Sequence, residues 1–201
     1  MFSKALIHLK TSDPILHKIA LEMEPFELSI HPDPFVRLTR SIIGQQLSVK
    51  AASTIYSRFE LLFSGKNITP ALLIKIPDEK MREAGISYQK ISYLKDLSLK
   101  VLEKEIELDK FLELPSETII QELVKVKGIG QWTAEMFLMF SLGRPDVFSY
   151  GDLGLQNAIK NIYKLPNKPT LVEMEKISSK WSPYRTYASM ILWRSLNNQP
   201  K

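Results

Sequence analysis

Hydrophobic positions recur at helical spacing along almost the whole chain. One stripe, in residues 87–106, consists of Ile91, Leu94, Leu97, Leu99 and Val101. A second stripe, in residues 116–126, consists of Ile119, Ile120, Leu123 and Val126. No two alternating segments are joined by a tight turn, so nothing in the pattern predicts a β-hairpin. The pattern predicts an all-α protein of about ten helices.

Residues that favour helix starts divide the chain into these helices. An aspartate followed by proline combines a good N-cap with a favoured first helical residue, and a serine side chain can accept a hydrogen bond from the first amides of a helix. The expected N-caps are Asp13, Asp33, Ser48, Ser116 and Ser182. No linker or repeat interrupts the 201 residues. We expect one domain with two lobes, residues 25–113 and residues 1–24 plus 114–201, and a ligand cleft between them.

Composition excludes several kinds of protein. The chain has no cysteine, which rules out disulfides, cysteine nucleophiles and cysteine-ligated zinc or iron–sulfur sites. No apolar run is long enough to span a bilayer and the first residues are too charged for a signal peptide, so we expect an intracellular protein with no membrane partner. The net charge of +5 is compatible with a polyanionic partner.

The segment Lys127-Gly128-Ile129-Gly130 joins two helical patterns across a short turn. So short a turn needs glycine where the backbone has a positive φ or where another group passes closely. The amides that follow Gly130, together with the positive end of the helix dipole, can bind an anion such as a DNA phosphate, and Lys125 and Lys127 add charge beside them. A bare G-x-G is also compatible with a plain helix-to-helix turn.

Three motifs in order resemble one family. The pattern L-V-x-V-x-G-I-G, followed by a polar residue, tryptophan and T-A, resembles the helix-hairpin-helix of DNA repair glycosylases. "IIGQQLSVKAA" (residues 42–52) and "WSPYRTYASMILW" (residues 181–193) are similar to the minor-groove segment and the last helix of the 3-methyladenine DNA glycosylase II (alkylpurine) branch. The resemblance covers roughly residues 35–195 and implies two helical lobes around a DNA-binding cleft, in a compact form without the N-terminal sheet domain of the bacterial relative.

The resemblance also implies an activity: a hydrolase that excises 3-methyladenine and 7-methylguanine from double-stranded DNA in base excision repair. Related bifunctional enzymes carry a Schiff-base lysine where this chain has Trp132, so a monofunctional enzyme that leaves an abasic site is implied. We expect a monomer that requires no cofactor. Two alternatives stay open: a glycosylase for neutral lesions such as hypoxanthine or etheno-adenine, and a non-catalytic DNA-binding protein.

Asp152 is the candidate catalytic residue. It lies 24 positions beyond Gly128, where the superfamily has its aspartate. It precedes the helical run "LGLQNAIKNIY", so it should be an N-cap whose negative charge the helix dipole stabilises. Such a carboxylate can stabilise an oxocarbenium-like sugar and orient the attacking water. A cap and nothing more is the alternative. We expect the competitor, Asp146, to close a turn with nearby backbone amides.

A flipped, positively charged alkylpurine favours electron-rich walls. The residues expected to line the base pocket are Trp132, Met136, Tyr150 and Trp193, whereas Phe137 and Phe140 are expected in the core. The wedge that fills the gap in the base stack is expected among Gln45, Gln46 and Leu47, although Gln45 and Gln46 could instead cap helix ends.

The family's hairpin carbonyls hold a structural monovalent or hard cation. By resemblance this site maps to the backbone carbonyls of Val124, Val126 and Ile129, and carbonyl oxygens suit such ions. Lys127 stands where proline is common in the family. We expect this lysine to loosen the hairpin slightly while adding a charge that can reach a phosphate.

Overall fold

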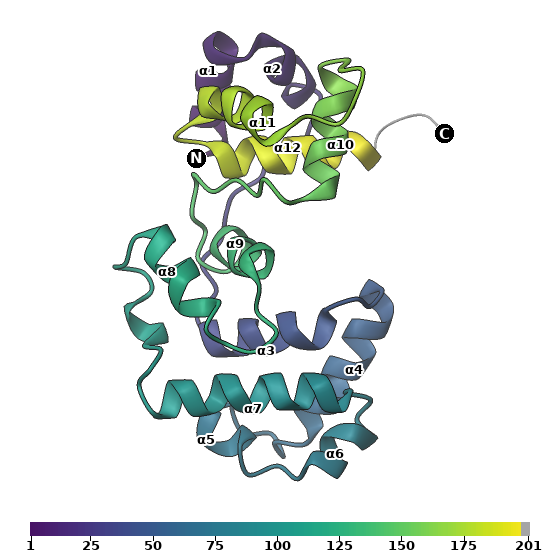
Figure 1. Cartoon of the computed structure of the whole chain (residues 1–201), viewed down its shortest axis with the longest axis vertical. Coiled ribbons are helices and arrows are strands. Elements are labelled where there is room, and N and C mark those ends of the chain that lie inside the picture. Colours follow the sequence, from purple (N-terminus) through teal and green to yellow (C-terminus); the bar gives the residue numbers. More distant parts are fainter. Residues whose placement is uncertain (198–201) are drawn as a thin grey trace. The chain divides into compact units, whose positions relative to one another are not determined.

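A computed structural model describes residues 1–197 of the chain (Figure 1). The described residues form α-helices and two short 3₁₀ helices and contain no β-strand, so the predicted all-α class is confirmed. The helices are α1 (Phe2–Ser12), α2 (Pro14–Ala20), α3 (Pro34–Gly44), α4 (Val49–Leu61), α5 (Pro70–Leu73), α6 (Asp78–Glu83), α7 (Tyr88–Leu102), η1 (Leu108–Lys110), α8 (Ser116–Leu123), α9 (Gln131–Phe140), α10 (Leu153–Ile162), α11 (Leu171–Ser178), η2 (Ser179–Trp181) and α12 (Arg185–Asn197).

The chain folds as two compact units, and the boundaries differ from the expected ones. One unit comprises residues 1–30 and the described residues from 138 onward, and the other comprises residues 31–137. Residues 114–137, expected with the termini, pack instead with residues 31–113. The ring of Phe137 packs edge-on against Phe111, and the turn at Gly128 lies against Tyr93. These contacts join segments far apart in the sequence, which no local pattern reports.

The 31–137 unit is built around α7. Figure 1 shows α3 running alongside α7, with α5 and α6 on another side of the same helix. Ile91, Leu94 and Leu97 of the predicted stripe are buried in this packing, whereas Leu99 is 44% exposed. The stripe is therefore narrower than the sequence indicated. Ser87 starts the helix by accepting a hydrogen bond from the amide of Lys90.

The other unit brings the two ends of the chain together. In it, α12 packs against α1, α2 and α10 (Figure 1). A buried carboxylate, Asp13, accepts the indole N–H of Trp181 at 2.9 Å and the hydroxyl of Tyr163 at 2.5 Å. Because buried polar groups are costly unless they are paired, these bonds let the α1–α2 junction lie inside the core. The unit presents α10 and α12 side by side, and this pair carries the candidate catalytic residue.

Most of the expected helix starts are confirmed. Asp13, Asp33 and Ser48 each accept the backbone amide that an N-cap should accept. Ser116 is wrong as a cap, because Pro115 takes the N-cap position with extended backbone and Ser116 is the first helical residue. Ser182 is wrong too: α12 begins at Arg185, and the Ser182 hydroxyl donates to Asp146 instead. No helix within residues 1–197 is both long and apolar enough to cross a membrane.

Candidate active site

Asp152 lies at the start of α10 and is only 8% exposed. Its Oδ1 accepts the backbone amide of Leu155 at 2.8 Å, so the prediction that it is an N-cap is confirmed. The same oxygen accepts the indole N–H of Trp193 at 2.9 Å. Two donors on one oxygen fix the orientation of the carboxylate, and a fixed charge is what electrostatic catalysis requires.

Trp193 reaches Asp152 from α12, the last helix of the chain. Its half-buried ring lies 5.8 Å from the ring of Phe140. Phe140 is 39% exposed, so the expectation that it belongs to the core is wrong, whereas Phe137 is 3% exposed and the same expectation is confirmed. Phe140 is the last residue of α9 and borders the indole instead of filling the interior.

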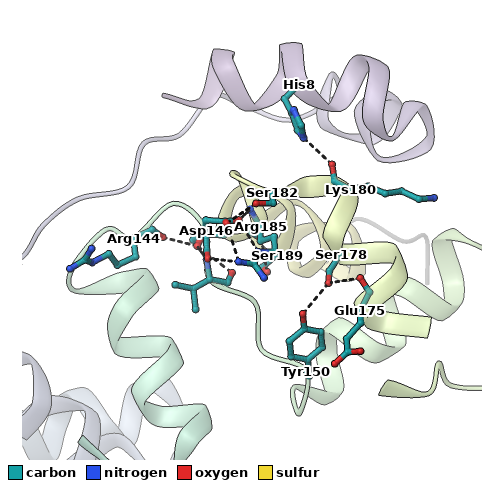
Figure 2. A network of polar contacts seen from close by, with 12 residues as sticks. His8, Arg144, Asp146, Tyr150, Glu175, Ser178, Lys180, Ser182, Arg185 and Ser189 are labelled. Atoms are coloured by element: carbon teal, nitrogen blue, oxygen red, sulfur yellow. Dashed lines mark hydrogen bonds and ion pairs between the residues drawn. The ribbon is translucent and has the colours of Figure 1, made fainter. Parts of the chain in front are cut away.

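Tyr150 belongs to the loop that precedes Asp152. Its hydroxyl accepts the Ser178 hydroxyl of α11 at 3.4 Å (Figure 2). Its ring packs edge-on against Phe148. The Tyr150 side chain is half-buried. The backbone carbonyl of Tyr150 accepts a hydrogen bond from the side-chain amide of Gln156. These contacts anchor the loop to α10 and α11 on the N-terminal side of Asp152.

The 31–137 unit holds a pocket of about 620 Å³. Two of the predicted base-pocket residues, Trp132 and Met136, line it together with the predicted wedge residues and the hairpin glycine; the lining is Ser41, Gly44, Gln45, Gln46, Leu47, Gln89, Lys90, Tyr93, Gly128, Trp132, Thr133 and Met136. Trp132 is 51% exposed. The structure thus brings the loop at residues 45–47 into one pocket with the distant segment that holds Gly128, Trp132 and Met136.

The expected wedge residues differ in their exposure and hydrogen bonding. Gln45 is half-buried, and its side-chain amide donates to the carbonyl of Gly128 at 2.8 Å, which ties the loop after α3 to the hairpin. Gln46, at φ 56°, and Leu47 are exposed. The ammonium of Lys90 donates to the carbonyls of Ile43 and Gln45 at 2.8 and 2.7 Å, and it stabilises the end of α3 in the manner typical of a lysine at a helix C-terminus.

The two hairpin glycines have different roles. Gly128 has φ 78°, and a Cβ on it would lie 2.1 Å from the ring of Tyr93. Gly130 does not have a positive φ, and a Cβ on it would meet nothing within 4 Å. Of these two glycines, the fold therefore requires only Gly128, and the space beside Gly130 is open.

The hairpin lysines lie on the surface in ion pairs. Lys125 contacts Glu122 at 2.7 Å, and Lys127 contacts Asp96 at 3.6 Å. Both ammonium groups are exposed, so each can exchange its carboxylate for a phosphate. The backbone amide of Lys127 also donates to Asp96 at 2.9 Å, a bond that a proline could not make. This bond opposes the loosening that the sequence predicted.

Comparison with known proteins identifies the family. The model of the HhH-GPD superfamily of base excision DNA repair proteins matches residues 39–183. The chain belongs to this superfamily. A DNA-3-methyladenine glycosidase of Bacillus halodurans has a similar solved structure, with 38% identity, a TM-score of 0.86, and coverage of 95% of this chain and 89% of that one.

Two further relatives indicate the branch of the superfamily to which the chain belongs. The 3-methyladenine DNA glycosylase Mag1 of Schizosaccharomyces pombe, solved in complex with abasic DNA, is 33% identical with a TM-score of 0.80 and coverage of 98% of this chain and 100% of that one. The YfjP protein of Bacillus subtilis is 36% identical over 79% of this chain, which spans 58% of the length of that protein. The chain therefore falls in the 3-methyladenine DNA glycosylase branch of the superfamily.

A polar clamp at Asp146 fixes the loop that leads to Asp152. Asp146 binds the guanidinium of Arg185 at 2.8 and 3.0 Å, the amide of Arg185 at 3.1 Å and the hydroxyl of Ser182 at 2.8 Å (Figure 2). Burial alone would raise the pKa of Asp146, but these donors hold it below its ordinary value. Asp146 does lie in a turn, as expected, but its carboxylate binds Ser182 and Arg185 and not the nearby amides.

Replacing Asp146 by asparagine should lower the free energy of unfolding at pH 7 by about 1–3 kcal/mol, because the charge-assisted bonds to Arg185 are lost. A lowered carboxyl pKa stabilises the fold above the unfolded-state value of about 3.9, and this contribution disappears as the pH falls through the folded-state value. The difference between wild type and variant in urea unfolding should therefore shrink below about pH 4. Glu24→Gln, at an exposed carboxylate, is the control. A difference that is constant with pH would contradict the clamp.

Two residues of the site were missed by sequence reasoning. Lys90 was not singled out, and Arg185 was seen only as part of a family motif. Each acts on a segment at least 39 residues away. A charged residue in the first turn of an otherwise apolar-faced helix was the one available signal, and it does not identify the partner.

Proposed function

We propose that this chain is a monofunctional glycosylase that releases alkylated purines, among them 3-methyladenine and 7-methylguanine, from double-stranded DNA, with Asp152 as the catalytic carboxylate. One observation carries the proposal: a buried aspartate at a helix N-terminus, with one oxygen held by the amide of Leu155 and the indole of Trp193. A protein that only bound DNA would have no use for a carboxylate fixed in this way.

The chemistry suits a fixed negative charge. Alkylation at N3 or N7 makes the purine a cation, so when the N-glycosidic bond breaks and its electrons go to the base, the base leaves neutral. Positive charge then develops on the sugar, and Asp152 stabilises it. Water adds to the sugar carbon and loses a proton, which leaves an abasic site. Asp152 orients this water as a secondary role.

The other predicted residues act in binding. Trp132 and Met136, and in the other unit Tyr150 and Trp193, are the side chains that we propose contact the alkylated base. The exposed Gln46 and Leu47 are better wedges than Gln45, whose amide is bonded to the hairpin. Amides after Gly130, with Lys125 and Lys127, hold the DNA backbone without reading its sequence.

The hairpin backbone offers the kind of ligand that a structural cation needs. The donors would be the carbonyls of Val124, Val126 and Ile129, which lie on the turn between α8 and α9, and oxygen is the ligand that hard cations prefer. The Val126 carbonyl already accepts the amide of Ile129 at 3.1 Å, which holds the turn in shape. Such an ion would bind a phosphate and would take no part in bond cleavage.

The test of the function is incubation with methylated double-stranded DNA, followed by chromatography of the released bases. We expect 3-methyladenine and 7-methylguanine from the wild type. Failure to release any base would contradict the proposal, and release of hypoxanthine or etheno-adenine alone would assign the chain to neutral lesions instead.

Borohydride should trap no covalent adduct between the protein and DNA. Trp132 is no nucleophile, and the one amine that lines the same pocket, Lys90, is committed to two carbonyls. Burial lowers the pKa of Lys90, so this lysine is the candidate to examine if an adduct forms. A trapped adduct in the wild type that Lys90→Met removes would show a bifunctional enzyme.

A further inference from the structure

Gly154, the second residue of α10, lies against the hydrogen bond between Asp152 and Trp193. A Cβ on Gly154 would lie 3.0 Å from Oδ1 of Asp152 and 3.1 Å from both Cδ1 and Nε1 of Trp193. Optimal contact between such atoms requires about 3.5 Å. Any side chain at this position must therefore displace the carboxylate or the indole by tenths of an ångström.

The backbone gives no reason for a glycine here. Gly154 is not among the glycines with positive φ, and it lies in a regular helix. Glycine is a poorer helix former than alanine, so alanine would be the more stable choice if backbone conformation alone decided. The absence of a side chain serves the contact between Asp152 and Trp193.

We propose that Gly154 is a positioning residue, whose missing side chain lets the indole N–H of Trp193 reach Oδ1 of Asp152. The proposal rests on the proposed function, in which that carboxylate stabilises the sugar cation. The amide of Leu155 holds the carboxylate from within α10, and the indole holds it from α12. The space at Gly154 borders both the accepting Oδ1 of Asp152 and the donating indole of Trp193.

The contacts of Asp152 and Trp193 limit how either side chain could move away from a Cβ at position 154. Asp152 is tied to Leu155 at 2.8 Å by the turn of its own helix, and the indole borders Phe140 at 5.8 Å. A Cβ at position 154 therefore lengthens the 2.9 Å separation between Nε1 and Oδ1. The carboxylate then loses its second donor and part of its fixed orientation.

The kinetic test uses two glycines three positions apart. Gly154→Ala should lower kcat for release of methylated bases about tenfold, and Gly154→Val about a hundredfold, because small misplacements of a catalytic group are costly. KM and affinity for abasic DNA should not worsen in either variant, and Gly154→Ala should keep its thermal stability because alanine is the better helix former. Gly151→Ala is the matched control, since a Cβ there meets nothing within 4 Å, and its kcat should stay within about twofold of wild type.

A double-mutant cycle identifies the route of the effect. In a Trp193→Phe background the indole N–H is already gone, so Gly154→Ala should cost nothing further. A kcat for Gly154→Ala within twofold of wild type would overturn the proposal. So would an equal loss from Gly154→Ala in both backgrounds, because the glycine would then act through something other than the indole.

A spectroscopic readout separates this proposal from the function on which it rests. The chain has three tryptophans, hence three indole N–H signals in a ¹⁵N–¹H spectrum, and the signal of Trp193 is assigned by Trp193→Phe. Gly154→Ala should shift that signal and speed its exchange with solvent, as Asp152→Leu should. If the wild type released no base, the proposed function would be wrong, but the Trp193 signal would still test the role of Gly154. A Trp193 signal unmoved by Gly154→Ala would overturn it.

Discussion

Replacing Asp152 by asparagine is expected to abolish release of methylated purines, a loss of about a thousandfold or more, while the fold and DNA binding survive. Asparagine is as good an N-cap as aspartate, and its carbonyl oxygen can still accept the amide of Leu155 and the indole of Trp193. The substitution therefore removes the charge and keeps the shape. The loss should appear in kcat, because the charge acts on the transition state.

The measurement compares single-turnover release from methylated DNA with binding to abasic DNA. Affinity of the variant for abasic DNA should stay within about tenfold of wild type, since phosphate contacts dominate such affinities. Thermal unfolding controls for stability. Turnover near the wild-type rate would remove Asp152 from the mechanism and would favour a carboxylate elsewhere.

The second large effect is expected at Gly128, and Gly130 provides its control. Gly128→Ala places a Cβ 2.1 to 2.6 Å from the ring of Tyr93 at a backbone position with φ 78°. Overpacking and the left-handed conformation together should destabilise the protein by about 2–4 kcal/mol. In a Tyr93→Ala background the clash is absent, and a cost of about 1–2 kcal/mol from the backbone should remain.

Gly130→Ala should separate stability from DNA binding. Its Cβ meets no protein atom within 4 Å, so the free energy of unfolding should stay within about 0.5 kcal/mol of wild type. A phosphate that approaches the amides at the start of α9 would meet that methyl group, and affinity for abasic DNA should fall about tenfold. Urea unfolding and fluorescence anisotropy measure the two quantities. Unchanged affinity would mean that the phosphate does not approach Gly130.

Local signals in the sequence were sufficient for most helix starts and for the N-cap position of Asp152. Asp13, Asp33 and Ser48 could be recognised as caps because a cap and the amide that it accepts lie three residues apart. Asp152 was predicted as a cap for the same reason, and the hairpin glycines marked a short turn. Where local chemistry was ambiguous, as at Ser116, the prediction failed.

The sequence by itself therefore determined the all-α class, the hairpin and the carboxylate at the start of α10, because each depends on neighbours within one helical turn. Only the tertiary structure showed that Trp193 donates to Asp152 across 41 residues and that Gln45 holds the Gly128 carbonyl across 83. The need for glycine at 154 was likewise hidden, since it arises from a side chain of another helix. Helical periodicity shows which face of a helix is buried, but the partner on that face is chosen by packing of the whole chain.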